Sequence, residues 1–293
     1  MPPGRTLARA ATVEGVGLFT ARPVRVTIAP APERSGITFI RADLPGRPAI
    51  PARVDRVVSE PARLGLPLPT PVRCTILAGN TAHACVITVE HVMSALAGLG
   101  VTDARIEVEG PELPACDGSA QPFVRAMLDA GLVDHEHGPD PIVPTRAISV
   151  GTAASGTIVA EPCAIGGALY RYALDYGAGA PIAPATASWR PGDDYARNVA
   201  PARTFCLAAE AQAMRMAGLL AHLSPRDMLV IGPDGPVDNE YRFPDEPARH
   251  KLLDLIGDLA LAGRPIHARI TATRTGHLLN HALAAALLAS ASA

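Results

Sequence analysis

Apolar and polar positions along the chain follow two periods, and these predict an alternation of strands and helices. Runs in which every second residue is apolar, such as 24–30 (VRVTIAP) and 36–43 (GITFIRAD), predict strands. Runs with apolar residues three and four apart predict helices, most clearly at 249–263 (RHKLLDLIGDLALAG). The same patterns predict further strands at 103–110, 145–150, 156–162, 168–176 and 266–274, and further helices at 88–100 with Thr88 as N-cap, at 119–131, near 207–217 and from His277 onward.

Two distant stretches repeat one order of elements. Residues 90–108 and 249–272 both read as a helix with a histidine near its start, then glycines, then a strand containing Ala-Arg-Ile. This echo indicates two related α+β halves, each of which supplies a histidine near a helix start. A polar, proline-rich stretch lies between them. We therefore expect an N-terminal domain at 1–134, a linker at 135–142 and a C-terminal domain at 143–293.

The helix predicted at 249–263 carries two polar residues on one face. His250 and Asp254 are four positions apart and therefore point the same way. Gly257 and Leu261 fall on that same face, so the helix is apolar nearly all round and is expected to be buried. Buried polar side chains need partners. The spacing alone suits a pair of metal ligands and a structural His–Asp pair equally well.

Two further places carry candidate acid–base groups. Glu90 precedes His91 at a predicted helix start, where it is able to take a proton from a metal-bound water or simply to complement the helix dipole. His277 begins the last predicted helix, and a helix N-terminus disfavours a cationic imidazole. A protonated His277 would therefore need a carboxylate, and Asp258, one turn beyond Asp254, is the candidate.

Composition narrows the class of protein. The 293 residues are 48% hydrophobic and 18% charged, which is typical of a globular chain. A net charge of −2 gives no electrostatic indication of nucleic-acid binding. The five cysteines are scattered and form no CxxC pair, which disfavours a disulfide framework and a cysteine zinc site and favours a reducing compartment. Without an apolar leader or a bilayer-length apolar run, we expect a cytoplasmic protein with no stable membrane insertion.

Several long motifs, in order, resemble the UDP-3-O-acyl-N-acetylglucosamine deacetylases of lipid A biosynthesis. The resemblance runs along nearly the whole chain. It implies an α+β fold of two similar layered α/β-sandwich domains, each with a sheet packed on helices, and an active site between them. The motifs that carry it are GVGLFT (15–20), APAPERSGITFIRADLP (29–45), TVEHVMSALAGLGVTDARIEVEGPELPACDGSAQPFV (88–124), ARTF (202–205), FPDEPARHKLLDLIGDLALAGRPI (243–266) and GHLLN (276–280).

Carried over position by position, the resemblance implies a metal-dependent amidohydrolase. The enzyme would remove the N-acetyl group of an acylated UDP-amino-sugar, giving acetate and a free amine, with Zn²⁺ as its metal and Fe²⁺ as an alternative. We expect it to act as a monomer. The implied metal ligands are His91, His250 and Asp254, the general base is Glu90, the cationic stabiliser or general acid is His277 oriented by Asp258, the oxyanion contact is Thr204, and the substrate contacts are Lys251, Phe205 and Glu210.

The chain departs from the family pattern at three places. Phe19 stands where the family has a histidine, 221–227 (AHLSPRD) replaces a Gly-Gly-Ser stretch beside the acyl-chain passage, and Pro247 lies just ahead of His250. These changes leave two alternatives: a paralogous deacetylase of another N-acetylated sugar-nucleotide or amino sugar, and a non-catalytic homologue that binds a sugar-nucleotide or a protein partner. The complete acid–base and metal set argues against the second.

Overall fold

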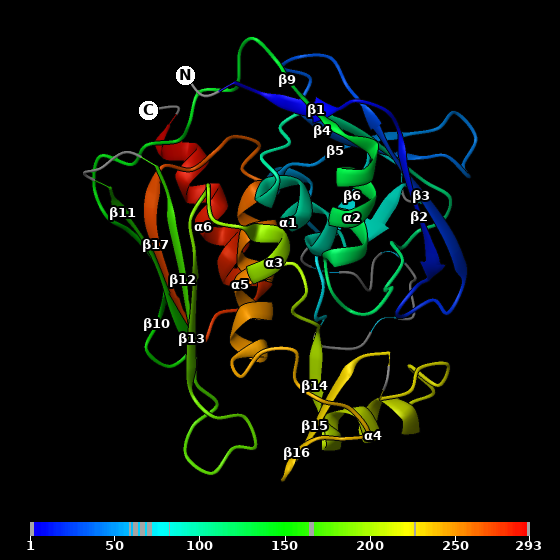
Figure 1. Ribbon diagram of the computed structural model, residues 1–293, viewed down its shortest axis with the longest axis vertical. Coiled ribbons are helices and arrows are strands. Elements are labelled where there is room, and N and C mark those ends of the chain that lie inside the picture. Colours follow the sequence, from blue (N-terminus) through cyan, green and yellow to red (C-terminus); the bar gives the residue numbers. More distant parts are fainter. Residues whose placement is uncertain are drawn as a thin grey trace.

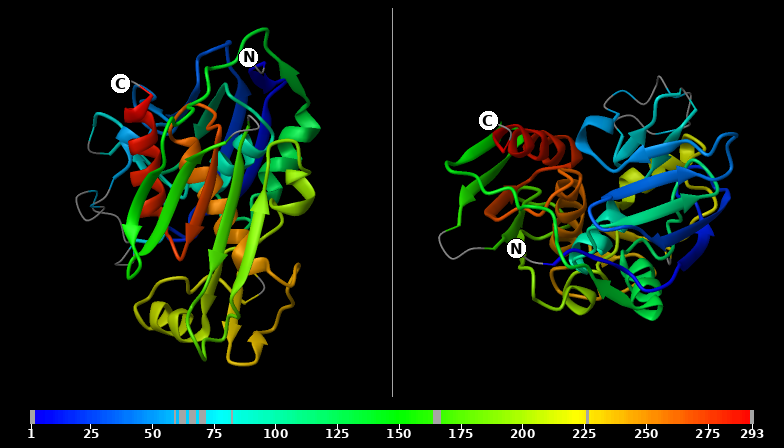
Figure 2. Two further views of the ribbon diagram at one scale, coloured as in Figure 1. Left: turned by 90° about the vertical axis from the view of Figure 1, so that its left-hand side faces the viewer. Right: turned by 90° about the horizontal axis from the view of Figure 1, so that it is seen from above.

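The computed structural model describes residues 3–58, 60, 64, 68, 72–81, 83–163, 167–225 and 227–291. It confirms the predicted α+β fold. Two five-stranded sheets form the outer layers, and the helices of the two halves lie between them (Figures 1 and 2). The right-hand view of Figure 2 shows this order of layers from above.

The first sheet belongs to the N-terminal half. Its strands follow the order β2-β3-β8-β4-β5, and only the β4–β8 pair is parallel. The alternation predicted for β3 is observed, because Val24, Val26 and Ile28 are buried on the face toward the helices. The elements are β2 (Ala11–Val16), β3 (Pro23–Pro30), β4 (Ile37–Arg41), β5 (Ala49–Pro51), β8 (Ala104–Val108), α1 (Glu90–Gly98) and α2 (Gln121–Ala130).

The second sheet repeats this topology in the C-terminal half. Its strands follow the order β10-β11-β17-β12-β13, and only the β12–β17 pair is parallel. In each sheet the last strand therefore lies between the second and the third, so the sequence echo marks a repeated fold. The elements are β10 (Ile148–Thr152), β11 (Gly156–Pro162), β12 (Leu169–Leu174), β13 (Ala185–Trp189), β17 (Ala268–Thr273), α5 (Glu246–Ala260) and α6 (His277–Ser290).

Each half carries an insertion between its fourth strand and its first long helix. The sequence patterns predicted only one of these inserted elements, the helix near 207–217. In Figure 1 the part of the second insertion from residue 205 to residue 236 projects at the bottom of the molecule. The first comprises η1 (Val54–Arg56), β6 (Ile76–Ala78) and β7 (Cys85–Ile87), and the second α3 (Tyr195–Asn198), β14 (Phe205–Leu207), α4 (Ala208–Met216), β15 (Leu229–Gly232) and β16 (Gly235–Pro236).

The predicted linker lies between the two halves. The N-terminal half closes with β1 (Arg5–Leu7) paired to β9 (Leu132–Asp134), and β10 begins at Ile148. The last linker residue, Ile142, already bonds to the C-terminal half, because its backbone N–H donates to the Pro265 carbonyl at 2.7 Å. The domain boundaries themselves stay a prediction.

Helices α1 and α5 cross where the two halves meet. The expectation of a helix buried nearly all round is confirmed, since α5 exposes little beyond Arg249 and Lys251. Gly257 makes the crossing possible: a Cβ at this position would lie 2.1 Å from the Glu90 carbonyl oxygen, inside van der Waals contact. Glu90 is the first residue of α1, so α5 approaches α1 at the start of that helix. Side chains at the start of α1 therefore meet side chains of α5.

The start of α1 differs from the sequence prediction. The N-cap is Val89, which makes no side-chain capping bond, so the prediction of Thr88 as N-cap is wrong. Thr88 has a φ of +60°, and its hydroxyl donates to the Ile87 carbonyl at 2.6 Å, away from the helix. The backbone turns sharply here to bring Glu90 against α5, and the threonine side chain follows that turn.

Candidate active site

Three predicted metal ligands come together at the crossing of α1 and α5. One ligand atom from each of His91, His250 and Asp254 lies within 4.8 Å of the others. His91 Nε2 lies 3.7 Å and His250 Nε2 3.4 Å from the same oxygen, Asp254 Oδ1. His250 and Asp254 are buried, whereas the His91 side chain keeps 17% of its surface exposed. Three converging ligands with one accessible side are what an open catalytic metal site requires.

The charge states of these groups suit a cation. Burial lowers the pKa of His91, and it lowers the pKa of His250 to about 3, so both imidazoles present lone pairs at neutral pH. Burial by itself would raise the pKa of Asp254, but the cations of Lys251 and His277 outweigh it and hold that pKa well below its usual range. Two neutral imidazoles and one carboxylate therefore face a common point.

A backbone carbonyl orients the imidazole ring of His250. Its Nδ1 lies 3.1 Å from the Ala202 carbonyl, which leaves Nε2 free to face the other ligands. The neighbouring Arg203 is held by Glu246 at the start of α5, through a buried ion pair of 2.8 Å. The hydrogen bond from His250 Nδ1 to the Ala202 carbonyl is of the kind that fixes the tautomer and the ring plane of a metal-binding histidine.

Glu90 is buried at the first position of α1. Its Oε2 accepts the backbone N–H of Thr75 at 2.9 Å. Burial raises the pKa of Glu90 to about 7, an effect that Asp254 and Asp258 reinforce and His277 partly offsets. A carboxyl group whose pKa lies near neutrality is suited to both taking and giving a proton.

His277 and Asp258 form the expected pair. His277 Nδ1 lies 2.8 Å from Asp258 Oδ2. Burial by itself would lower the pKa of His277, but Asp258, with help from Glu90 and Asp254, raises it to about 9. Burial would likewise raise the pKa of Asp258, yet the neighbouring histidines keep it well below its usual range. At neutral pH the pair is therefore an imidazolium and a carboxylate.

Three further neighbours of this pair were not predicted from the sequence. Asp258 also accepts the Thr75 hydroxyl at 2.6 Å and the Asn280 amide at 2.9 Å, and its Oδ1 lies 3.1 Å from His281 Nε2. One signal was available: His281 follows His277 by four positions, the same helical spacing that singled out His250 and Asp254. Thr75, in a short loop before β6, carries no pattern that marks it.

The oxyanion candidate is part of the same site. Thr204, just before β14, lines a small pocket together with Glu90 and His91. Its backbone N–H donates to the Gly118 carbonyl at 2.6 Å, and its own carbonyl accepts from Leu229 at 3.1 Å. These two bonds hold Thr204 between the halves. The pocket volume, about 40 Å³, has room for roughly one water molecule.

The predicted substrate contacts are arranged unequally. Lys251 Nζ lies 2.7 Å from Asp254 Oδ2 and 6.0 Å from the centre of the Phe205 ring, so these two residues border the metal ligands. Glu210, on α4, instead bonds to Arg73 at 2.6 Å. This ion pair joins the two insertions. Arg73 lines the small pocket beside Glu90, so Glu210 reaches the site only through its ion pair with Arg73.

Two of the sequence departures meet in space. Phe19 is buried in an apolar cluster between the insertions, and its backbone N–H donates to Glu112 at 2.9 Å. His222 Nε2 lies 3.2 Å from the Gly17 carbonyl, so segment 221–227 reaches back to this loop. Residue 226 lies outside the described residues. The third departure, Pro247, lies in the first turn of α5, where proline is tolerated, and the ligand helix is intact.

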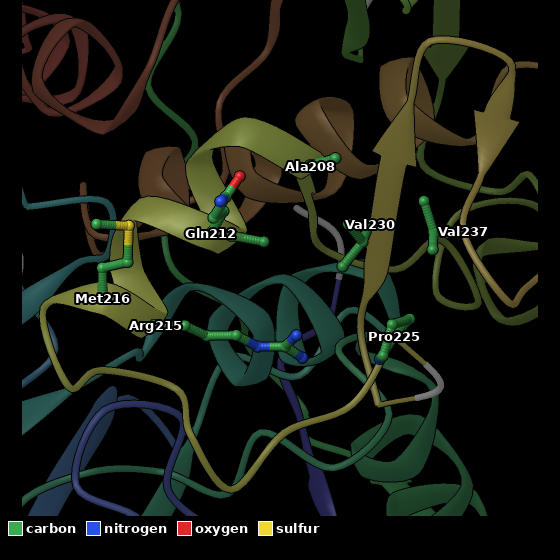
Figure 3. A pocket seen from close by; sticks show the side chains of 8 residues that line it. Ala208, Gln212, Arg215, Met216, Pro225, Val230 and Val237 are labelled. Atoms are coloured by element: carbon green, nitrogen blue, oxygen red, sulfur yellow. The ribbon is translucent and has the colours of Figure 1, made fainter.

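Residues of segment 221–227 line two cavities. Leu223 and Asp227 line the small pocket beside Glu90. Pro225 lines a second pocket of about 450 Å³ between α4 and the β15–β16 strands, as Figure 3 shows. Its walls are mostly aliphatic, and Arg215 and Met216 lie at one side. An apolar pocket therefore lies next to a polar, metal-binding one.

Comparisons with known proteins agree along the length of the chain. The LpxC family model, described as UDP-3-O-acyl N-acetylglycosamine deacetylase, matches residues 4–289. A protein named UDP-3-O-acyl-N-acetylglucosamine deacetylase from Anaeromyxobacter sp. (strain Fw109-5) is 38% identical over 97% of this chain and 88% of its own length. One of the same name from Nostoc sp. (strain PCC 7120) is 37% identical over 97% of this chain and 98% of its own.

Proposed function

The chain belongs to the UDP-3-O-acyl N-acetylglycosamine deacetylase family, and from this premise we propose that it hydrolyses the N-acetyl group of UDP-3-O-acyl-N-acetylglucosamine in lipid A biosynthesis. The products are acetate and a free amine. One observation carries the proposal: the metal triad, the buried Glu90 and the His277–Asp258 pair converge at one helix crossing. These are the groups that hydrolysis of an amide needs at neutral pH.

The donor set fits a catalytic zinc ion. His91, His250 and Asp254 would hold it, and Fe²⁺ suits two imidazoles and a carboxylate as well. When bound, the metal ion polarises the amide carbonyl and lowers the pKa of a water molecule. Zinc is our proposal because it is the usual metal for hydrolysis at a three-ligand open site.

Glu90 acts as general base. Its carboxylate lines the small pocket with His91, and the backbone N–H of Thr75 fixes one of its oxygens. The other oxygen is left to take a proton from the attacking water. Carbonyl attack then places negative charge on the amide oxygen, and the hydroxyl of Thr204, which lines the same pocket, donates a hydrogen bond to it.

His277 acts as general acid. An amide nitrogen is a poor leaving group until it is protonated, and His277 is an imidazolium at neutral pH because Asp258 holds its Nδ1 proton. Nε2 then carries the proton that is delivered to the leaving nitrogen. Before that step, the same cation stabilises the charge of the tetrahedral intermediate.

The substrate occupies the surroundings of this centre. Lys251 and Phe205 border the metal ligands and contact the sugar-nucleotide, and Glu210 contributes through its ion pair with Arg73. The acyl chain enters the pocket of about 450 Å³ beside α4, since its volume and aliphatic walls suit such a chain. This placement gives segment 221–227 the task of separating the acyl chain from the reacting amide.

Cellular location and assembly remain predictions. Among the described residues, no helix is long and apolar enough to cross a bilayer. We infer from the scattered cysteines that the protein works in the cytoplasm, and we expect a monomer, because both halves of the site come from one chain.

The proposed function is tested with purified protein and defined substrates. Amine release is measured from the UDP-amino-sugar with and without a 3-O-acyl chain, alongside metal analysis of protein prepared without chelator. About one metal ion per chain and turnover of the acylated substrate are expected. Turnover of only the non-acylated compound would identify a paralogue of different specificity. Absence of both metal and turnover would identify a non-catalytic homologue.

A further inference from the structure

Thr75 bonds to the proposed general base and to the carboxylate that orients the proposed general acid. Its backbone N–H donates to Glu90 at 2.9 Å, and its hydroxyl donates to Asp258 at 2.6 Å. Its carbonyl accepts the N–H of Val89, the N-cap of α1, at 3.3 Å. The residue is fully buried and comes from the N-terminal insertion. Every polar group of Thr75 therefore bonds to an element of the site.

His281 completes the same network from α6. Its Nε2 lies 3.1 Å from Asp258 Oδ1 and 3.0 Å from the Thr75 hydroxyl oxygen. Asp258 has no proton to give, and the single hydroxyl proton of Thr75 points to Asp258, so Nε2 must be the donor. Nδ1 of His281 is buried without a hydrogen-bond partner in the described part of the chain. The Nε2–H tautomer fits this geometry.

These contacts fill both oxygens of Asp258. Oδ1 accepts from Thr75 and His281, and Oδ2 accepts from His277 and Asn280. A carboxylate has about four acceptor positions, so Asp258 has no freedom to rotate. The fixed carboxylate in turn fixes the orientation of the His277 imidazole, which bonds to Oδ2.

We propose that Thr75 and His281 are positioning residues, which fix the position of the Asp258–His277 pair relative to Glu90 across the interface of the two halves. The inference rests on the proposed function. Neither residue touches the reacting atoms. His281 acts through Asp258, whereas Thr75 acts through Asp258 and through its hydroxyl oxygen, which lies 3.4 Å from His277 Nδ1 on the far side of the ring from the leaving group. Within the described part of the chain, Thr75 links the two proton-transferring groups, because its backbone fixes the base and its side chain fixes the partner of the acid. A misplacement of about 1 Å at such a centre costs on the order of 100-fold in rate.

The charges around His277 set the direction of a pH effect. Asp258 and Asp254 face it from α5, Glu90 faces it from α1, and His281 stacks beside it on α6 at 6.2 Å between ring centres. The donors on Oδ1 compete with the imidazolium for the negative charge of Asp258. Without one of them, Asp258 binds the imidazolium more strongly, and the alkaline limb of the rate profile moves to higher pH.

The test compares Thr75→Val with Thr75→Ser. Valine keeps the shape and both backbone bonds but has no hydroxyl, whereas serine keeps the hydroxyl. We expect T75V to lower kcat by about 10- to 100-fold with little change in KM, and to move the alkaline limb of the rate profile to higher pH. T75S should retain most of the activity and keep the alkaline limb at its wild-type pH. Metal content and thermal unfolding of both variants are measured to exclude misfolding.

His281 is tested in the same way. Leucine removes the donor, and glutamine places an amide N–H near the position of Nε2. H281L is expected to resemble T75V, and H281Q to recover part of the lost kcat. Equal loss in H281L and H281Q, with an unmoved alkaline limb, would assign His281 to packing alone.

A readout that needs no substrate separates this inference from the proposed function. The Nδ1 proton of His277, bonded to a buried carboxylate, is followed as a downfield proton resonance of histidine-labelled protein, and its absence in H277Q assigns it. The resonance should shift in T75V and H281L but not in T75S. If T75V leaves both kcat and this resonance unchanged, or T75S loses as much as T75V, the inference is wrong. If wild-type protein has no deacetylase activity, the proposed function fails, whatever the resonance shows.

Discussion

Gly257 in α5 lies against the carbonyl of Glu90 in α1, so closely that a Cβ on Gly257 would come within 2.1 Å of that oxygen. The contact joins the helix that carries two metal ligands to the residue that acts as base. A side chain at this position must therefore move the base away from the metal ligands. The site depends on the absence of one methyl group.

Gly257→Ala should consequently reduce both stability and catalysis. Overpacking of this kind costs about 1–3 kcal/mol of unfolding free energy, and the displacement of Glu90 should lower kcat further. Gly98→Ala is the matched control, because its Cβ would meet the Tyr195 ring at 2.3 Å, far from the base along α1. Denaturant unfolding and kcat, corrected for the folded fraction, are measured for both. A kcat loss in G98A equal to that in G257A would contradict the special role of this contact.

Metal removal should abolish activity without unfolding the chain. Lys251 pairs with Asp254 at 2.7 Å, so the buried carboxylate keeps a partner when no metal is bound. Treatment with chelator should stop turnover and lower the thermal midpoint, because a ligand at 100 times its Kd stabilises by about 2.7 kcal/mol. Adding Zn²⁺ back should restore both. His250→Ala should fail to recover, since it lacks one of the three ligands.

Glu90→Gln should separate proton transfer from metal binding. The amide oxygen of glutamine still accepts the N–H of Thr75, so the helix start is expected to keep its geometry. Loss of a general base lowers kcat by about 10²- to 10⁴-fold. Metal content, determined by elemental analysis, should stay at the wild-type level. Full activity in E90Q would exclude Glu90 as the base.

The His277–Asp258 pair should define the alkaline limit of activity. The pKa of His277 is raised from 6.5 to about 9, so the cation and the activity that needs it should be lost as pH rises through about 9. The sign for stability is the same: a raised histidine pKa stabilises the folded state fully below 6.5, and this contribution disappears as pH passes about 9. Asp258→Asn should move both limits to lower pH. Rate profiles and unfolding midpoints across pH 6 to 10, about the window of this titration, provide the check.

The pocket beside α4 should set acyl-chain preference. Ala211 lines it, and phenylalanine at this position fills part of its volume of about 450 Å³. A211F should lower kcat/KM for long-chain substrates by about 10-fold or more while sparing short-chain ones, because each buried methylene is worth about 0.8 kcal/mol. Ala213→Phe on the exposed side of α4 is the control. Equal effects on all chain lengths would place the acyl chain elsewhere.

Local pattern was enough to identify most of the principal elements. The 3.6-residue period predicted α5, and the lack of a polar face predicted that it is buried, which the structure confirms. The repeated helix–strand order likewise pointed to two related halves. These properties depend on residues within a few positions of one another, and the period of the chain encodes them directly. The small strands of the two insertions have too few residues to show a period.

The arrangement of the site was decided by tertiary structure. Nothing in the pattern of residues 72–78 marks Thr75, and its partner Asp258 lies 183 positions away. The pairing of Glu210 with Arg73, 137 positions away, is equally invisible along the chain. The sequence by itself determined which chemical groups are present and which helices present them. Only the packing of the two halves and their insertions against each other decided which of these groups meet, because burial and charge pairing depend on distance in space rather than along the chain.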